Sequence, residues 1–569
     1  MNTPAIIVLG QNSVVLGKRI QTGLTNATLY GLDRRTIDVD VSFANFGETL
    51  RSLFTQARPI IGICAAGILI RTLAPLLTDK RQEPPVIAIA EDGSAVVPLL
   101  GGLHGVNDLA RQIAAALEVQ AAITTTGDLR FRTALLSPPP GYCLANPGAA
   151  KTFISDLLAG ATVKLLGNAP WLADSKLPIA ADGQLTLQVT ERAVTPAEDC
   201  LVYYPTTLAI GISSTISPDP VTAIAHLQQI LTKAELAPAA IAGVFGLASH
   251  AGHSGIQAIA EAFNVPARFF EPSFVGQAAE RAETIAIAAA GAASQLVVQD
   301  QDCAIAVALR PLDANTVGRP QGRLAIVGTG PGSAEWMSPE VKQLLHSATD
   351  WVGYSTYLNL IEPLRTHQQR HDSDNRQELD RARLALNLAA AGRFVAVVSS
   401  GDPGIYAMAA AVFEALEQDA KPAWQQIAIQ VAPGISALQA AAARIGAPIG
   451  HDFCVISLSD ILKPWSAIAE RITAAAAADF VIAFYNPVSQ QRTWQLDKAR
   501  ELLLAVRSPD TPVVLARNLG RAGESVVVRS LSQLSANEVD MRTLVLVGSG
   551  KTRIIQQRDR AWVYTPRHY

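Results

Sequence analysis

Short apolar runs alternate along the chain with turn residues and with segments of helical periodicity. Beyond residue 323, each apolar run is followed by a turn containing Gly, Pro or Asn and then, in most cases, by a helical pattern. The predicted strands there are 324–327, 394–398, 427–431, 480–484, 513–516 and 544–547. Strands that alternate with helices predict an α/β fold, in which ligands bind at the carboxyl ends of parallel strands.

The N-terminal 310 residues also predict α/β structure, in more than one part. Buried strands are expected at 5–9, 60–64 and 208–211, and helices at 107–117 and 219–231. Pro220 suits the first turn of the latter helix. The alanine-rich run 284–293 is helix or strand, because periodicity does not distinguish the two there.

Two stretches rich in Pro and Gly mark domain boundaries, one near residue 140 and one at 310–323 (RPLDANTVGRPQGR). We therefore expect a multidomain α/β protein. Its predicted parts are an N-terminal domain at 1–140, a middle domain at 141–207, a third domain at 208–309, a linker at 310–323 and a C-terminal domain at 324–569.

Composition narrows the class of protein. The 569 residues carry a formal net charge of −3, whereas a protein that binds nucleic acid through phosphate contacts normally has a basic excess. Hydrophobic residues make up 49% and charged residues 17%, which excludes a largely disordered chain. The longest apolar stretch, 60–70, is well short of the roughly 20 residues that span a bilayer.

Cysteine usage and the first residues bear on location. The five cysteines are scattered, without a CxxC pair or a Cys/His cluster, so neither a disulfide framework nor a bound metal is expected. The segment MNTPAIIVLG lacks a basic region followed by a long apolar one, so no secretory signal is expected. A cytoplasmic location is the simplest expectation.

Glycine-rich loops after predicted strands are the first candidates for chemistry. GTGPG at 328–332 precedes a helix that Ser338 and Pro339 would begin. It does not fit the dinucleotide fingerprint, because the third glycine would fall on Ser333. Taken alone, the loop is equally compatible with a structural turn. The segment GSGKT at 548–552 is no phosphate-binding loop, because residue 545 is Val.

Three more loops of this kind follow predicted strands: 399–406 (SSGDPGIY), 432–437 (APGISA) and 484–487 (FYNP). The Asp402 carboxylate is suited to accept hydrogen bonds from a hydroxyl or ammonium group of a ligand, or else caps the following helix. Four such loops at strand ends of one sheet system predict a binding region lined by backbone amides and small polar groups.

The motifs GTGPG, SSGDPGIY, APGISALQAAAARIGAP, FYNP and LARNLGR, in this order, resemble the tetrapyrrole methylases. YSTYLNLI at 354–361, FYNPVSQQR and VGSGKTR are similar to the subgroup that methylates C-17 of precorrin-3B or cobalt-factor III, although a serine is more usual at Gly550. The resemblance covers about 322–553. It implies two α/β subdomains with a cleft, S-adenosylmethionine bound between them, a homodimer, and methylation with ring contraction.

The resemblance also implies roles for single residues. Pro331 would lie beside substrate and cofactor, and Asn486 and Leu519 would meet the adenine through the backbone. The remaining cofactor contacts would come from the second and third loops, at Gly401, Asp402, Ile405, Ser436 and Ala437.

The N-terminal half, about 56–309, resembles the cobalt-precorrin-5A hydrolases. The matching motifs are ICAAGI, AIAEDGSAVVPLLGGLHGVNDLAR and ITTTGD. These proteins open a corrin lactone and release acetaldehyde. The resemblance makes Glu91, Asp92 and His104 candidates for general acid/base chemistry. An ordinary polar turn at Glu91–Asp92 and a structural His104 are the alternatives. Cations suited to pair with corrinoid carboxylates are Arg71, Lys80, Arg81, Arg130 and Arg132.

One departure bears on this half. The family usually carries a Cys–Arg-rich turn and a Lys/Glu pair where this chain has Gly211-Ile-Ser-Ser-Thr215 and a segment at 247–254. A non-catalytic, corrinoid-binding N-terminal half joined to an active methyltransferase is therefore the alternative. A uroporphyrinogen or diphthine methylase is a further alternative for the C-terminal half, against which YSTYLNLI and FYNP argue. Whether the substrate carries cobalt stays open.

Overall fold

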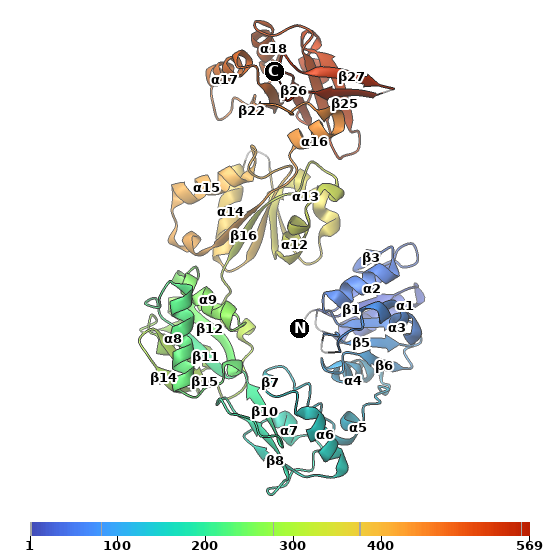
Figure 1. Cartoon of the computed structure of the whole chain (residues 1–569), viewed down its shortest axis with the longest axis vertical. Helices are drawn as coiled ribbons and strands as arrows, with labels where there is room; N and C mark the ends of the chain where they lie inside the picture. Colours follow the sequence, from blue (N-terminus) through green and yellow to red (C-terminus); the bar gives the residue numbers. More distant parts are fainter. Residues whose placement is uncertain are drawn as a thin grey trace. The chain divides into compact units, whose positions relative to one another are not determined.

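The computed structural model describes residues 3–24, 26–80, 82–276, 278–374, 377–558 and 560–568. They form two compact units (Figure 1). Unit 1 contains residues 1–247 and 253–318, and unit 2 contains residues 248–252 and 319–569. No helix in the described part of the chain is long and apolar enough to cross a membrane.

Unit 1 begins with a six-stranded sheet in the order β3-β2-β1-β4-β5-β6, parallel except for β6. Its strands are β1 (Ala5–Val8), β2 (Thr28–Leu32), β3 (Val41–Phe43), β4 (Ile60–Ile63), β5 (Val86–Ile89) and β6 (Val96–Leu100). Helices α1 (Asn12–Thr22) and α4 (Val106–Leu117) pack with one apolar cluster, and α2 (Phe46–Thr55) and α3 (Ala66–Leu73) with another. Both faces of the sheet are covered by helices, as in doubly wound folds.

A four-stranded sheet follows, in the order β7-β10-β9-β8. Its strands are β7 (Tyr142–Leu144), β8 (Val163–Leu166), β9 (Leu185–Val189) and β10 (Cys200–Pro205), with helices α5 (Thr126–Phe131), α6 (Ala150–Ala159) and α7 (Pro170–Ala173). The buried Tyr203 packs edge-on against Trp171, and its hydroxyl donates to the Leu135 carbonyl at 2.7 Å.

The third sheet of unit 1 has the order β13-β12-β11-β15-β14. Its strands are β11 (Leu208–Ile212), β12 (Ile241–Leu247), β13 (Ala267–Phe270), β14 (Gln295–Gln299) and β15 (Cys303–Val307), and its helices are α8 (Pro220–Lys233), α9 (Ser254–Ala262), α10 (Pro272–Val275) and α11 (Ala282–Ala290). The alanine-rich run is thus a helix. It packs so closely on β11 that a Cβ on Gly211 would meet the Ala282 carbonyl oxygen at 2.2 Å.

The predicted linker is structured over much of its length. Residues up to Gly318 belong to unit 1. The Arg268 guanidinium donates to the carbonyl oxygens of Asn315, Val317 and Gly318 at 2.7–3.0 Å. The boundary between the units therefore falls inside 310–323, between Gly318 and Arg319.

Unit 2 begins with a five-stranded parallel sheet in the order β18-β17-β19-β16-β20. Its strands are β16 (Arg323–Gly328), β17 (Asp350–Tyr354), β18 (Gln369–Ser373), β19 (Phe394–Ser399) and β20 (Ala428–Ala432). Helices α12 (Pro339–Ser347) and α13 (Ser355–Ile361) pack with one apolar cluster, and α14 (Glu378–Ala390) and α15 (Met408–Asp419) with another. Ser338 caps α12 as predicted, accepting from the Val341 amide.

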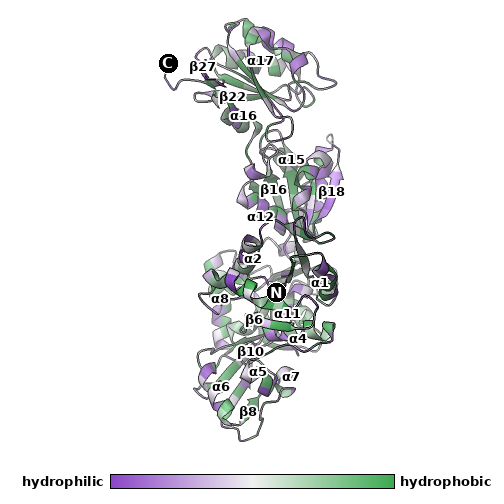
Figure 2. Ribbon diagram, turned by 90° about the vertical axis from the view of Figure 1, so that its right-hand side faces the viewer, coloured by the Kyte–Doolittle hydropathy of each residue, from purple (hydrophilic) through white to green (hydrophobic). Residues whose placement is uncertain are grey.

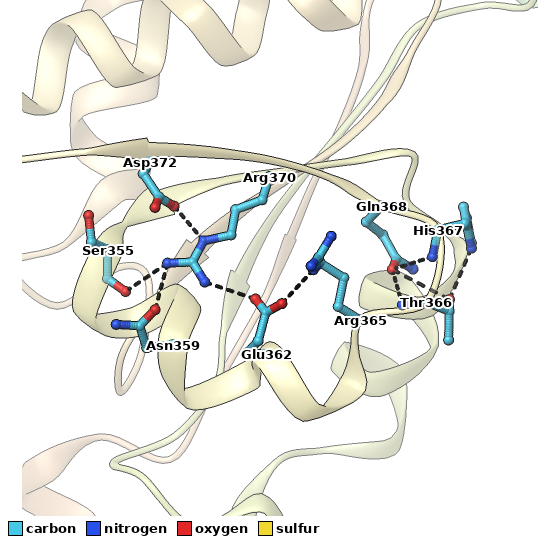
Figure 3. Close-up of polar contacts among 9 residues, drawn as sticks. All are labelled: Ser355, Asn359, Glu362, Arg365, Thr366, His367, Gln368, Arg370 and Asp372. Atoms are coloured by element: carbon cyan, nitrogen blue, oxygen red, sulfur yellow. Dashed lines mark hydrogen bonds and ion pairs between the residues drawn. The ribbon is translucent and has the colours of Figure 1, made fainter. Parts of the chain in front are cut away.

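The edge strand β18 is held by ion pairs (Figure 3). Arg370 donates to Glu362 at 2.8 Å, to Asp372 at 2.5 Å and to Asn359 at 2.6 Å, and Arg365 also contacts Glu362. Hydrogen bonds from the two arginines lower the pKa of Glu362. The network joins β18 to α13, which contains most of the YSTYLNLI segment.

The second sheet of unit 2 has the order β22-β23-β26-β24-β25. Its strands are β22 (Phe453–Ser457), β23 (Val481–Tyr485), β24 (Pro512–Arg517), β25 (Ser525–Ser530) and β26 (Thr543–Val547), with helices α16 (Ala437–Ile445), α17 (Trp465–Ala477) and α18 (Gln495–Leu504). A small sheet contains β21 (Gly446–Ala447), β27 (Arg553–Gln557) and β28 (Arg560–Tyr564). The four predicted strand-end loops therefore come from two sheets: three follow strands of the first sheet and one follows β23.

Candidate functional site

The first two loops of unit 2 are joined directly. The Gly401 amide donates to the Gly330 carbonyl at 2.8 Å, and the Gly330 amide donates back to Gly401 at 3.2 Å. Both glycines have positive φ angles, +77° at Gly330 and +70° at Gly401, in a region that other residues rarely adopt. The loops that follow β16 and β19 thus form one continuous backbone surface at the carboxyl ends of their strands.

The third loop approaches the first two as closely as backbone permits. A Cβ on Gly434 would meet the Gly401 carbonyl oxygen at 2.2 Å and that of Gly328 at 2.5 Å. The Asp402 carboxylate accepts from the amides of Gly404 at 2.8 Å and Gly434 at 3.2 Å. Asp402 therefore ties the second loop to the third, and its remaining lone pairs are available to a ligand.

The third loop continues into α16, which leads to the second sheet. Ser436 caps α16 in a capping box with Gln439, so its hydroxyl is engaged with the helix. Two residues on, the Leu438 amide donates to the Tyr485 hydroxyl at 3.1 Å. Burial raises the pKa of Tyr485, which keeps its hydroxyl protonated. The start of α16, at Ala437, is thereby fixed against the end of β23.

The second sheet contributes loops at one edge, because β22, β23 and β24 point the same way. Asn486 follows β23 with φ +51°, and its side-chain amide donates to the Ser457 hydroxyl at 3.1 Å. Leu519 follows β24 and is buried. Both positions present backbone at the carboxyl ends of their strands, as the resemblance implies.

Arg521 connects the two sets of loops and was absent from the predicted site residues. Its guanidinium donates to the Pro331 carbonyl at 2.7 Å and to the Ser400 hydroxyl at 2.8 Å. Burial lowers the pKa of Arg521, although an arginine remains protonated near neutrality. Its place at the end of LARNLGR was the available signal, but nothing local reveals partners 121 and 190 residues away.

The predicted residues of the methyltransferase half are therefore brought together in unit 2. Pro331, Gly401, Asp402, Ser436 and Asn486 lie on loops linked by the bonds above, and Ile405 continues the second loop, its amide donating to the Asp402 carbonyl at 3.3 Å. The arrangement offers one carboxylate, peptide groups and a fixed arginine. Such a surface suits recognition and alignment of a polar small molecule.

In unit 1 the candidate acid/base residues do not come together. β5 and β6 are antiparallel, with Ile89 opposite Val96 and Val86 opposite Leu100. Glu91 and Asp92 lie in the turn beyond the first pair, whereas His104 follows β6 beyond the second. One strand length, roughly 15 Å, separates the two ends.

The two ends also differ in character. Glu91 lies at the carboxyl ends of the parallel strands, where Ser13 donates to it at 3.3 Å. Hydrogen bonds from Ser94 lower the pKa of Asp92. His104 is exposed, and its backbone amide donates a hydrogen bond to the Gly101 carbonyl oxygen at 2.8 Å. The roles of all three residues stay predictions.

The cations predicted to meet corrinoid carboxylates are dispersed. Arg71 is on α3, Arg130 is on α5 and donates to the Leu158 carbonyl at 2.8 Å, and Lys80 and Arg132 are exposed. Arg81 lies outside the described residues.

The turn that departs from the hydrolase pattern borders a pocket of about 460 Å³ at the end of β11. Its Ser213 and Thr215 hydroxyls lie 2.7 Å apart, and Thr215 also contacts Asp302. Ligand atoms of His226, Asp300 and Asp302 lie within 4.8 Å of one another, a grouping that the sequence did not suggest. His226 and Asp300 already pair at 3.0 Å.

Comparison with known proteins gives two family matches. Residues 323–535 match the Tetrapyrrole (Corrin/Porphyrin) Methylases, and residues 48–128 match the family described as Cobalamin synthesis G N-terminal. A crystal structure of the methyltransferase CobJ is 46% identical, with a TM-score of 0.41, and covers 43% of this chain and 100% of its own.

Two related proteins show how much of this chain is matched. A precorrin-3B C(17)-methyltransferase from Sinorhizobium is 51% identical over 250 residues, which are 44% of this chain and 97% of that protein. The cobalamin biosynthesis protein CobIJ from Mycobacterium bovis is 52% identical over 252 residues, 44% of this chain and 48% of that protein. The chain thus spans about half the length of the latter. Through its C-terminal unit, the chain belongs to the tetrapyrrole (corrin/porphyrin) methylases.

Proposed function

We propose that unit 2 transfers a methyl group from S-adenosylmethionine to C-17 of precorrin-3B or cobalt-factor III in cobalamin biosynthesis. The observation that carries the proposal is the meeting of the strand-end loops around Gly330, Gly401 and Gly434, closed by Arg521. These loops lie within residues 323–535, which match the tetrapyrrole (corrin/porphyrin) methylases.

The residues present fit this methyl donor. The Asp402 carboxylate keeps acceptor capacity for an ammonium or ribose hydroxyl, beyond the two amides that it already accepts. Peptide groups at Ala437, Asn486 and Leu519 are suited to the edge of an adenine. A Cβ on Gly328 or Gly434 would collide with the backbone of a neighbouring loop, so glycine at these two positions lets the loops pack against one another.

Transfer from a sulfonium is an in-line displacement, which depends on alignment and exclusion of water more than on a strong base. A site of peptide groups fixed by Arg521 and Asp402 meets that requirement. Following the subgroup resemblance, we infer that methylation is accompanied by ring contraction and lactone formation.

For unit 1 we infer a cobalt-precorrin-5A hydrolase that opens the lactone and releases acetaldehyde. The match of residues 48–128 supports a role in the same pathway. The alternative is a non-catalytic corrinoid-binding half, which the separation of Glu91 from His104 and the serines of the 211–215 turn favour. Tethering two enzymes of one pathway raises the local concentration of an intermediate.

The test is mass spectrometry and NMR of the product formed by the full chain from S-adenosylmethionine with cobalt-factor III or precorrin-3B. A contracted macrocycle one methyl group heavier is expected. A methylated but unchanged macrocycle would leave a generic tetrapyrrole methylase, and no methylation of either substrate would refute the assignment.

We further infer a homodimer formed through unit 2, in the cytoplasm. The family resemblance supports the dimer, and the few scattered cysteines support a reducing compartment. Light scattering on the purified chain tests the dimer, and a mass of one chain would contradict it.

A further inference from the structure

The loop between β22 and α17 presents apolar side chains to solvent. Ile461 is 73% exposed and Leu462 90% exposed, and they are adjacent at its tip. Single exposed apolar residues are ordinary on protein surfaces. These two require more attention because they are neighbours and because the loop that carries them is anchored.

Three contacts fix the base of this loop. The Leu458 amide donates to the Tyr485 carbonyl at 3.0 Å, and the Leu458 side chain is fully buried. Arg492 donates to the Ser459 hydroxyl at 3.4 Å, and Gln495 donates to Asp460 at 2.8 Å. The position of the tip is therefore set by the loop that follows β23, which is itself part of the candidate site.

The tip lies beside the second site loop. The Lys463 ammonium is 5.9 Å from the centre of the Tyr406 ring. Tyr406 ends the segment SSGDPGIY and is 51% exposed, and its hydroxyl bonds Val455 and Ser457 of β22 at 3.0 and 3.2 Å. Tyr406, Ile461 and Leu462 together are called the apolar rim below.

A cation, Lys463, lies beside the rim. Burial and the nearby Arg471 lower the pKa of Lys463, so an anion beside this ammonium would be stabilising. Among the described residues, no carboxylate forms an ion pair with Lys463 or Arg471. An apolar surface next to a cation without a counter-charge matches a ligand with a flat apolar face and carboxylates at its periphery.

We propose that the apolar rim and Lys463 bind the tetrapyrrole substrate, with Ile461 and Leu462 against one face of the macrocycle and Lys463 paired with a peripheral carboxylate. The inference rests on the proposed function and names the residues that select its substrate. The methyl donor is recognised by the loops around Asp402, so Ile461, Leu462 and Lys463 contribute to affinity for the tetrapyrrole alone.

The experiment compares steady-state kinetics of the full chain with those of Ile461→Ser/Leu462→Ser, using cobalt-factor III as substrate. Removing two apolar side chains that the bound macrocycle would cover is expected to raise KM for the tetrapyrrole about tenfold or more, with kcat nearly unchanged. Affinity for S-adenosylmethionine, measured by calorimetry, stays at the wild-type value. Val506→Ser, at a residue 58% exposed in the same unit, is the matched control.

The charge is tested separately. Lys463→Gln is expected to raise KM several-fold at low salt and less at high salt, because salt screens an exposed ion pair. Lys463→Arg is expected to restore most of the affinity. Lys498→Gln, which removes a lysine paired with Glu501 on α18, controls for the change of net charge.

The outcomes separate the two proposals. If the wild-type protein methylates cobalt-factor III and the rim variants have an unchanged KM, the proposed role of the rim is overturned and the proposed function is not. The proposed role of the rim is also overturned if the variants lose affinity for S-adenosylmethionine to the same extent. If the variants lose a dimer without a change in KM, the rim is instead an interface between copies of the chain. A wild-type protein that binds S-adenosylmethionine but no tetrapyrrole refutes both proposals.

Discussion

At the scale of the residue, Gly434 marks the point where three loops leave no space for a side chain. In Gly434→Ala the new methyl group would overlap the carbonyl oxygens of Gly401 and Gly328. Because both obstacles are backbone, the loops must separate, and we expect loss of S-adenosylmethionine binding and a free energy of unfolding lower by about 1–3 kcal/mol. Calorimetry and urea unfolding measure the two effects.

Gly148→Ala is the control for this variant, since a Cβ at Gly148 meets nothing within 4 Å. Wild-type affinity for S-adenosylmethionine in Gly434→Ala would show that the loops tolerate separation and would contradict the assigned binding surface.

Arg521 is the second residue whose role can be isolated. Lysine keeps the charge in Arg521→Lys, but its single ammonium cannot reproduce the fixed pair of bonds to Pro331 and Ser400. Loss of one charge-assisted hydrogen bond costs about 1.5–3 kcal/mol, so kcat/KM for methyl transfer should fall about tenfold to a hundredfold.

Arg542→Lys, at an exposed arginine of the same unit, should retain wild-type kinetics. If Arg521→Lys is equally active, the guanidinium is not what fixes the loops.

At the scale of the element, the first sheet of unit 2 depends on a carboxylate at the start of β17. The Asp350 side chain is fully buried and contacts His371 on β18 at 2.8 Å and Arg393 next to β19. Burial alone would raise its pKa, but hydrogen bonds from Arg393, Thr349 and His371 hold the pKa of Asp350 below its usual value. The group therefore contributes stability above the pKa of an unfolded aspartate, about 3.9, and that contribution is lost as pH falls through the folded value.

Asp350→Asn should lower the free energy of unfolding at pH 7 by about 1–3 kcal/mol, because it removes the charge-assisted hydrogen bonds that the buried carboxylate accepts from Arg393 and His371. As pH falls below about 4, the free energy of unfolding should also decrease less in this variant than in the wild type. Urea unfolding at several pH values measures both effects. Asp372→Asn, at a carboxylate 46% exposed, is expected to change stability by less than about 1 kcal/mol, and an equal effect of the two variants would count against the buried pair.

At the scale of the whole molecule, the two units separate the two proposed activities. The strand-end loops all lie in unit 2. A fragment of residues 319–569 should therefore bind S-adenosylmethionine with the affinity of the full chain, and a fragment of residues 1–318 should not bind it. Calorimetry on both fragments measures this binding. A folded 319–569 fragment that does not bind S-adenosylmethionine would contradict the proposed function of unit 2.

Glu91 and His104 lie at opposite ends of the β5–β6 pair, so only one of them can take part in a given proton transfer. Of Glu91→Gln and His104→Ala, we expect one to lower kcat for acetaldehyde release from cobalt-precorrin-5A by about 10²-fold or more and the other to leave kcat within a few-fold. Methyl transfer should be unaffected in both, because the two activities lie in different units.

Equal loss in two folded variants would contradict the separation of the two ends. A wild-type protein that releases no acetaldehyde would favour the corrinoid-binding alternative, and circular dichroism excludes misfolding of the variants.

The sequence alone determined the elements whose pattern is local. The predicted strands of unit 2 coincide with β16, β19, β20, β23, β24 and β26 to within one residue at their starts, because each is an apolar run closed by a turn residue. The central strand β17 was missed, as were the edge strands β18, β22 and β25. β18 reads QRHDS and is mostly hydrophilic in Figure 2, because an edge strand exposes much of its surface.

Candidate positions in the methyltransferase half came from the resemblance of the strand-end motifs to the tetrapyrrole methylases, and each of those motifs is local in the sequence. Only the tertiary structure decided that the loops come from two sheets, that Arg521 closes them, and that an antiparallel β6 sets His104 apart from Glu91. Strand order and direction bring distant residues together or keep them apart, and neither is encoded in the periodicity of any single segment.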